Sequence, residues 1–139
     1  MKILIDTSVW SIVLRKTSKN LNREEVNIKE HIIELIEDGR VSMIGPIRQE
    51  ILSGITKQNN FVSLREHLAA FEDITIETSD YETAANFYNI CRSKGIQGSH
   101  IDFLICAISY NHKMPIFTLD KDFLNYKKYI DIEIYQRSK

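Results

Sequence analysis

Lys2-Ile3-Leu4-Ile5-Asp6-Thr7-Ser8-Val9-Trp10 is the stretch that decides the fold. Its three consecutive aliphatic residues, with no polar alternation, predict a short strand buried on both faces, as in a parallel sheet. This strand runs directly into an acid and two hydroxyl residues. Ligands of open α/β sheets bind in the crevice beyond the carboxyl ends of the strands. Asp6 is therefore a candidate functional residue, although it could also be only the N-cap of a helix beginning at Thr7.

The rest of the chain alternates short apolar segments with helical patterns. Four further apolar segments predict strands at 41–44, 74–76, 116–118 and 132–134. The helical segments between them include two capping-box patterns, which Ser79 and Ser99 open. This alternation predicts an α/β fold, a three-layer α/β/α sandwich around a short, mostly parallel sheet of about five strands.

Length and composition predict one ordinary globular domain over residues 1–139, with 43% hydrophobic and 27% charged residues. A net charge of -1 gives no overall attraction to nucleic acid, so polyanion binding would need a local basic patch or metal ions. No apolar run approaches the ~18 residues that span a bilayer, and no secretory signal is expected. Cys91 and Cys106 lack metal-ligand spacing and are predicted to be reduced and packed, as in a cytoplasmic protein.

Four acids lie at comparable places, each at or near the start of a predicted helix. They are Asp6 after the first strand, Glu50 one turn into the helix opened by Pro46, Asp102 in the first turn after Ser99, and Asp120 after the strand at 116–118. The carboxyl ends of parallel strands share one edge of the sheet, so these carboxylates could converge in one crevice. Taken singly, each could instead be a cap or an ordinary acid of a first helical turn.

A crevice with three or four carboxylates is costly through mutual repulsion, unless protons or divalent metal ions neutralise them. Oxygen ligands without a His/Cys set suit Mg²⁺ or Mn²⁺ rather than zinc. Ions of this kind promote the hydrolysis of phosphodiesters.

Four motifs in this order resemble those of the PIN-domain ribonucleases, most closely the VapC-type toxins of type II toxin–antitoxin pairs. The motifs are the strand with Asp6-Thr7-Ser8, Pro46-x-x-x-Glu50-Ile51-Leu52-x-Gly54, Asp102-x-Leu104-Ile105-x-Ala107, and Thr118-x-Asp120-x-Asp122-Phe123. The resemblance spans nearly the whole chain. It implies a PIN-like domain and a metal-dependent endoribonuclease that acts as a toxin.

The resemblance also implies roles for single residues. Asp6, Glu50, Asp102 and Asp120 would form the acidic catalytic site, with Asp6 and Asp102 the direct ligands of Mg²⁺ or Mn²⁺ and Glu50 and Asp120 further ligands. Thr7, Ser8 and Thr118 would be hydroxyls that orient the carboxylates. Asp122 would either help to position water or cap the last helix, and the cap is the favoured interpretation. The expected partners are RNA, a small antitoxin whose basic side chain enters the acidic pocket, and a second copy of the chain.

Contacts with RNA phosphates require cations. The candidates nearest the acids in sequence are Arg15, Arg48 and Lys121, although most such charges simply face solvent. Tyr126, together with Tyr129 and Tyr135, could stack on bases, but packing explains these tyrosines equally well.

Two features near the third acid are less easily interpreted. Family members often carry a small residue directly after this acid, where this chain has Phe103, so the geometry around Asp102 is open. His100 could contact substrate or carry protons, but a single histidine in a first helical turn is more often just an exposed polar residue.

Two other classes of function are also compatible with acids after strands. An aspartate-nucleophile phosphatase would place a second Asp two residues after the first, where this chain has Ser8. A receiver-like, non-catalytic signalling or binding module would need paired acids after its first strand and a suitably placed lysine. The chain lacks both of these patterns, so the sequence favours the metal-dependent ribonuclease.

Overall fold

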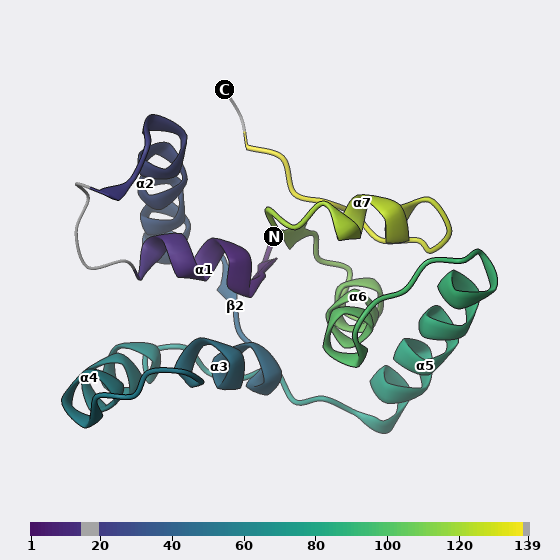
Figure 1. Cartoon of the computed structure of the whole chain (residues 1–139), viewed down its shortest axis with the longest axis horizontal. Coiled ribbons are helices and arrows are strands. Elements are labelled where there is room, and N and C mark those ends of the chain that lie inside the picture. Colours follow the sequence, from purple (N-terminus) through teal and green to yellow (C-terminus); the bar gives the residue numbers. More distant parts are fainter. Residues whose placement is uncertain (15–19, 138–139) are drawn as a thin grey trace.

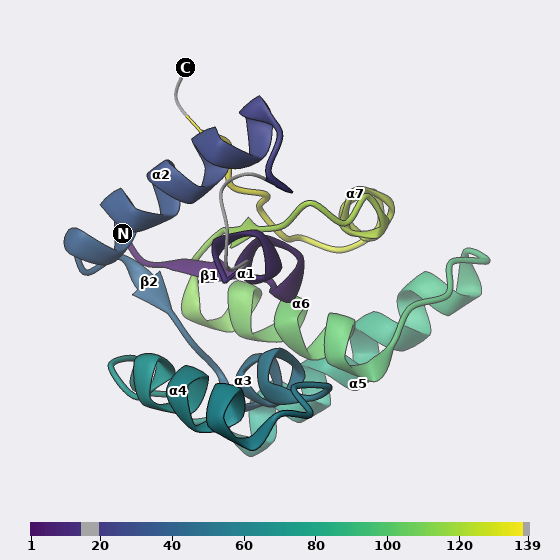
Figure 2. The same cartoon turned by 60° about the vertical axis from the view of Figure 1, so that its left-hand side comes forward.

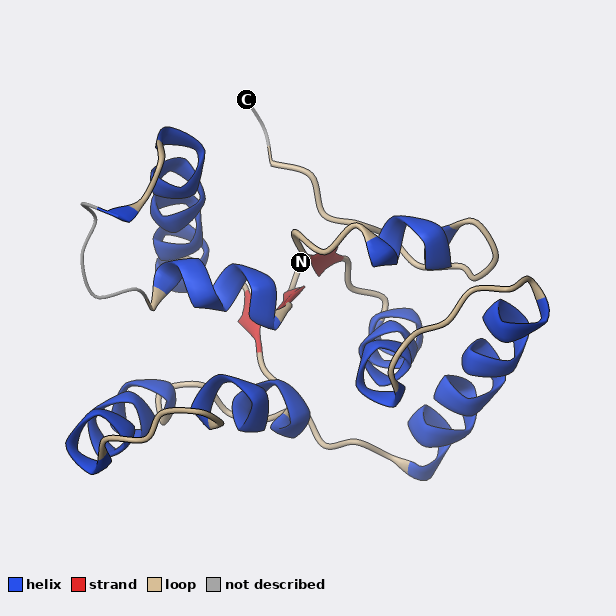
Figure 3. Ribbon diagram, in the orientation of Figure 1, coloured by secondary structure: helices blue, strands red, loops and turns tan. Residues whose placement is uncertain are grey.

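The centre of the fold is a parallel sheet with the strand order β2-β1-β3. The computed structural model describes residues 1–14 and 20–137. The strands within this part of the chain are β1 (Ile3–Ile5), β2 (Val41–Ser42) and β3 (Ile116–Phe117). Figure 3 shows these short strands at the centre of a mostly helical molecule.

The register places β1 between its two neighbours. Ile3 lies opposite Val41 on one side, and Leu4 lies opposite Ile116 on the other. All three side chains of β1 are completely buried, which confirms the prediction from the unbroken apolar run. The first strand is therefore the central one, and Asp6 follows it directly.

The predicted α/β class is confirmed, but the described residues form three regular strands rather than about five. The two outer segments each contribute one bridged residue pair. Met43 pairs in parallel with Asp73, and Ile116 pairs in parallel with Ile134. These bridges extend the sheet at both edges without the repeated pairing that defines a strand.

Helices occupy most of the described chain. They are α1 (Thr7–Val13), α2 (Arg23–Glu37), α3 (Gly45–Leu52), α4 (Gln58–Leu68), α5 (Thr78–Ser93), α6 (His100–His112) and α7 (Asp122–Lys127). Figure 1 shows their arrangement around the strands. Pro46 lies in the first turn of α3, as predicted, where its missing N–H leaves no helical hydrogen bond unmade.

Helices cover both faces of the sheet. Figure 2 shows α2 on one side of β1 and α6 on the other. The inward stripe of α2 consists of Ile28, Ile32 and Leu35. Helix α6 is buried continuously from Phe103 to Ser109, as expected for a helix enclosed by the sheet and by α5. This arrangement is the predicted three-layer sandwich.

Helices α5 and α6 form a tightly packed hairpin. Helix α5 begins before the capping-box pattern at Ser79, because Glu77 is the N-cap and Asp80 supplies the paired carboxylate. This buried carboxylate accepts hydrogen bonds from the Glu77 N–H at 2.9 Å and from the Asn111 side chain at 2.8 Å. Asp80 thereby ties the start of α5 to the end of α6.

The two cysteines lie one on each helix of this hairpin. Cys91 and Cys106 are both free and buried, as predicted. Within the described residues, no helix is long and apolar enough to cross a membrane.

Candidate active site

Asp6 occupies the N-cap position of α1, but its carboxylate does not cap the helix. Its Oδ2 atom instead accepts two hydrogen bonds of 2.8 Å, from the hydroxyls of Ser8 and Thr118. The other oxygen, Oδ1, makes no hydrogen bond to any described residue. Asp6 is only 6% exposed. The alternative that Asp6 serves only as a helix cap is therefore wrong.

The same two hydroxyls also hold the loop that follows β3. Ser8 accepts a hydrogen bond from the Leu119 N–H, and Thr118 accepts one from the Asp120 N–H, both at 3.0 Å. Each hydroxyl thus donates to Asp6 and accepts from the main chain. This arrangement fixes Asp6 and the loop of Asp120 relative to one another.

Asp102 lies in the first turn of α6 and is held at two points. Its main-chain N–H donates to Oγ of Ser99 at 3.0 Å, which is one half of the predicted capping box. Its carboxylate accepts a 2.7 Å hydrogen bond from the hydroxyl of Tyr126. The ring of Tyr126 is completely buried, so this residue is not available to stack on a base. Its contact with Asp102 was not anticipated from the sequence.

The pKa of Asp102 is raised by its surroundings. Burial is the largest cause, and the negative charges of Asp120 and Asp6 raise the pKa further. Hydrogen bonds from Tyr126 and Ser99 act in the opposite direction. Asp102 is thus close enough to both Asp6 and Asp120 to be repelled by them, although the three residues lie far apart in the sequence.

Glu50 is joined to this group through Thr7. The Thr7 hydroxyl donates a hydrogen bond to Oε1 of Glu50, which connects α3 to the start of α1 next to Asp6. Glu50 is exposed, unlike Asp6. Among these acids, Glu50 is therefore more accessible to solvent than Asp6.

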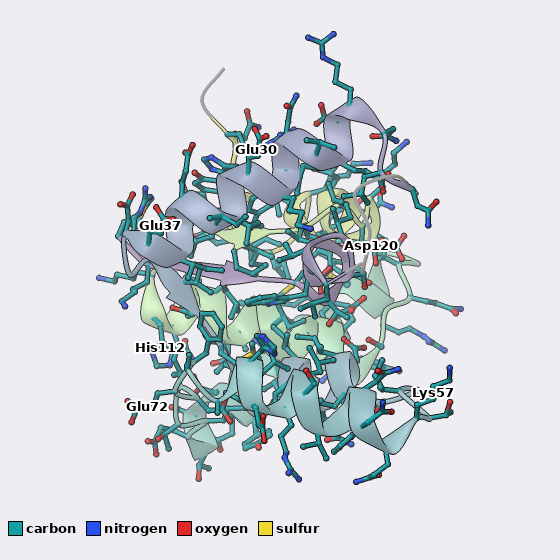
Figure 4. The ribbon with its side chains drawn as sticks, turned by 90° about the vertical axis from the view of Figure 1, so that its left-hand side faces the viewer. Glu30, Glu37, Lys57, Glu72, His112 and Asp120 are labelled. Carbon is teal, nitrogen blue, oxygen red and sulfur yellow. The ribbon has the colours of Figure 1, made fainter. Side chains whose placement is uncertain are left out.

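Asp122 is connected to the acids by a main-chain hydrogen bond to Asp120. It is the first residue of α7, and its N–H donates to Oδ1 of Asp120 at 2.9 Å. Its own carboxylate is exposed and makes no hydrogen bond to the described residues, and Lys121 occupies the N-cap position. The favoured interpretation, that Asp122 caps the last helix, is therefore wrong. Figure 4 shows Asp120 on the opposite side of the view from His112, the last residue of α6.

The acids could accommodate a hard divalent cation. In the described parts of the chain, no three His, Cys, Asp or Glu side chains are placed to hold one ion together. Mg²⁺, however, usually takes one or two protein carboxylates and keeps several waters. The pair Asp6 and Asp102, with oxygen donors alone, fits that requirement and does not suit zinc.

The three cations expected to contact RNA differ in their surroundings. Arg48 is engaged within the protein: it pairs with Asp73 at 2.8 Å and donates to the main-chain oxygens of Leu68 and Phe71. It fastens α3 to the segment after α4, so the expected phosphate contact is corrected to this structural role. Lys121 is exposed beside Asp120. Arg15 lies outside the described residues.

The two unusual residues near Asp102 both join an aromatic cluster. His100 is exposed, and its ring stacks on that of Tyr88 with centroids 5.0 Å apart. Phe103 is buried and contacts the rings of Tyr88 and Tyr126 at 5.6 and 4.8 Å. The bulk of Phe103 therefore packs against Tyr126, the residue whose hydroxyl donates to Asp102.

Comparisons with known proteins agree with these observations. The family model described as the PIN domain matches residues 3–129. Similar curated proteins are VapC ribonuclease Mb1587 of Mycobacterium bovis and Ribonuclease VapC11 of Mycobacterium tuberculosis. Each is 32% identical over 123 residues, covering 87% of this chain and 88% of the relative.

Solved structures share the fold over nearly their whole length. FitAcB from Neisseria gonorrhoeae matches with a TM-score of 0.74 at 19% identity, covering 96% of both chains. VapBC2 from Rickettsia felis, bound to a DNA fragment from their promoter, matches with a TM-score of 0.75 at 15% identity. That match covers 99% of this chain and 100% of the other.

Proposed function

The chain belongs to the PIN-domain family, and we propose that it is a Mg²⁺- or Mn²⁺-dependent endoribonuclease, the toxin of a toxin–antitoxin pair. In this proposal residues 1–139 form one domain. The family model and the VapC names of the relatives confirm the resemblance drawn from the four acid motifs. These relatives are named as ribonucleases, which supports RNA as the substrate of this chain.

One observation carries the proposal. Asp6 stands where a helix cap would stand, yet its carboxylate is turned to the hydroxyls of Ser8 and Thr118. A carboxylate used only for the helix would accept from the first-turn N–H groups. Asp6 instead lies among other acids, at the carboxyl end of a central strand, where α/β proteins bind their ligands.

The residues divide into two roles. Asp6 and Asp102 would hold the metal, with Glu50 and Asp120 completing the acidic site. Thr7, Ser8 and Thr118 would fix the acids through the hydrogen bonds described above. A bound Mg²⁺ or Mn²⁺ supplies Lewis-acid chemistry, which activates water and stabilises the leaving oxygen of a phosphodiester.

RNA cleavage by the purified protein is the direct test. We expect total cellular RNA and a synthetic single-stranded RNA, incubated with Mg²⁺ or Mn²⁺, to be cut at discrete sites, and EDTA to stop the reaction. Asp6→Asn and Asp102→Asn should each abolish cleavage while leaving the circular dichroism spectrum unchanged. Asp38→Asn is the matched control, because Asp38 is an exposed residue at the end of α2.

Two results would contradict the proposal in different ways. Undiminished cleavage by either site variant would remove the site assignment but not the activity. Metal-independent cleavage that persists in EDTA would remove the proposed metal dependence. Calorimetric titration with Mn²⁺ separates these results, since binding should be lost in the same two variants.

The proposed partners follow from the acidic site. A small antitoxin could mask it with a basic side chain, because a cation placed among Asp6, Asp102 and Asp120 offsets their repulsion. Co-expression with the product of a short reading frame directly upstream should yield a complex that no longer cuts RNA. Light scattering of the isolated chain tests the proposed homodimer, which a monomeric mass at all concentrations would contradict.

A further inference from the structure

Tyr126 is packed among aromatic rings next to Asp102. It lies on α7 and is completely buried. Its ring contacts Phe103 at a centroid distance of 4.8 Å and meets Phe123 edge-on at 5.3 Å. These neighbours come from α6 and α7, so the direction of the phenol is set by packing on both helices.

The hydroxyl of Tyr126 has one polar partner among the described residues, the carboxylate of Asp102. A buried tyrosine hydroxyl needs such a partner, because an unpaired polar group in the interior is costly. The bond is short, at 2.7 Å, as charge-assisted hydrogen bonds are. An ionised carboxylate can only accept, so the hydroxyl of Tyr126 is the donor of this bond.

The loop before α6 is shaped to admit this hydroxyl. A Cβ atom on Gly98 would lie 2.5 Å from the Tyr126 hydroxyl and 2.8 Å from the ring of Phe103. Such approaches are far inside van der Waals contact, so any side chain at this position would displace the tyrosine. Glycine is needed here for space, and it leaves the tyrosine directly against the segment that leads into Asp102.

We infer that Tyr126 is a positioning residue of the proposed active site: its hydroxyl fixes the Asp102 carboxylate in the orientation that binds the divalent cation. The inference rests on the proposed function, since it assigns Asp102 to the metal. It gives Asp102 what Ser8 and Thr118 give Asp6, a neutral donor on one carboxylate oxygen. Outer hydrogen bonds of this kind typically change metal affinity by about 10- to 100-fold.

Removal of one oxygen atom tests this role. Tyr126→Phe keeps the ring contacts and deletes only the hydroxyl. Tyr110→Phe is the matched control, because Tyr110 is half exposed near the other end of α6. Electron paramagnetic resonance of free Mn²⁺ measures binding to each protein without reference to catalysis.

We expect the Mn²⁺ dissociation constant to rise about 10-fold or more in Tyr126→Phe and to stay unchanged in Tyr110→Phe. The Mn²⁺ concentration for half-maximal RNA cleavage should rise by the same factor, while the rate at saturating Mn²⁺ approaches that of the wild type. Gly98→Ala should weaken Mn²⁺ binding in the same direction with the hydroxyl still present. This second variant keeps the inference testable if Tyr126→Phe is poorly folded.

Crystals of metal-free Tyr126→Phe distinguish the inference from the function on which it rests. A displaced Asp102 carboxylate supports positioning by Tyr126, even if the wild type proves not to cut RNA. An Asp102 carboxylate in its original place, with unchanged Mn²⁺ affinity, overturns the inference even if the wild type cuts RNA efficiently. A loss of thermal stability with unchanged Mn²⁺ affinity also overturns it, because that result describes a purely structural tyrosine.

Discussion

Thr118→Val should weaken both the fold and the acidic site, because the Thr118 hydroxyl makes two hydrogen bonds that valine cannot make. It donates to Asp6 at 2.8 Å and accepts from the Asp120 N–H at 3.0 Å. Valine has nearly the same shape, so the β3 backbone and its packing should remain intact.

The magnitude follows from the two bonds. A hydrogen bond to a charged group contributes about 1.5–3 kcal/mol, and an unpaired N–H adds a smaller cost where water can reach it. Thr118 is only partly buried, and Ser8 still donates to Asp6, so we expect a net loss of about 2 kcal/mol. This loss corresponds to a fall of about 4–8 °C in Tm for a chain of this size.

Urea unfolding measures this loss, with Thr56→Val as the control, since Thr56 is an exposed loop residue. The Ser8→Ala and Thr118→Val double variant adds a second check. Both hydroxyls serve the same oxygen of Asp6, so their effects should be non-additive by about 0.5–3 kcal/mol. An unchanged free energy of unfolding, together with strictly additive single effects, would refute the reasoning.

Two further predictions concern charges away from the centre of the site. Burial alone would raise the pKa of Asp80, but hydrogen bonds from Asn111 and a main-chain N–H, with a nearby histidine, lower it overall. This depressed pKa stabilises the fold fully above the unfolded value of about 3.9, and the contribution is lost as pH falls below it. Asp80→Asn should therefore lower the free energy of unfolding by about 2 kcal/mol at pH 7. Urea unfolding at several pH values should show that this difference from the wild type shrinks below about pH 4, and a difference that stays constant would contradict the prediction. Lys121→Gln should raise the KM for RNA, and it should reduce the slope of log binding constant against log salt concentration by about 0.7. Arg48→Gln should lower the free energy of unfolding and leave that slope unchanged, because Asp73 already neutralises Arg48. Equal slopes in the two variants would contradict the assignment of Lys121 to RNA binding.

The central strand and the start of α3 were predictable because they depend on local sequence patterns. An unbroken Ile-Leu-Ile run can only be buried, and Pro46 marks the first turn of α3 wherever that helix packs. The outer strands were less predictable. A short apolar segment looks the same in the sequence whether it pairs with its neighbour over several residues or through one bridge. The segments near Asp73 and Ile134 each pair through a single bridge.

Side-chain partners were the part that sequence patterns could not supply. Arg48 looked available for phosphate because nothing in the local sequence points to Asp73, which lies 25 positions away. The contact of Tyr126 with Asp102 had one signal, a tyrosine three residues after Phe123 on the buried stripe of a helix. A buried hydroxyl must find an acceptor. Which acceptor it finds depends on how α7 packs against α6.

The choice of partners around the acids is itself an argument for a cation site. Acids with structural roles in this protein are paired with cationic or amide groups: Asp73 with Arg48, and Asp80 with Asn111. Within the described residues, the hydrogen bonds that reach the carboxylates of Asp6 and Asp102 come from hydroxyls alone.

Hydroxyl donors orient a carboxylate without cancelling its charge. Burial raises the pKa of Asp102 most, and the repulsion by Asp120 and Asp6, which raises it further, is left in place by the protein's own side chains. A lysine or arginine at the position of Tyr126 would remove that repulsion and would also compete with any incoming cation. Acids that are fixed firmly but left negative support the proposal that this site receives positive charge from outside the chain, as a metal ion or as a basic side chain of a partner.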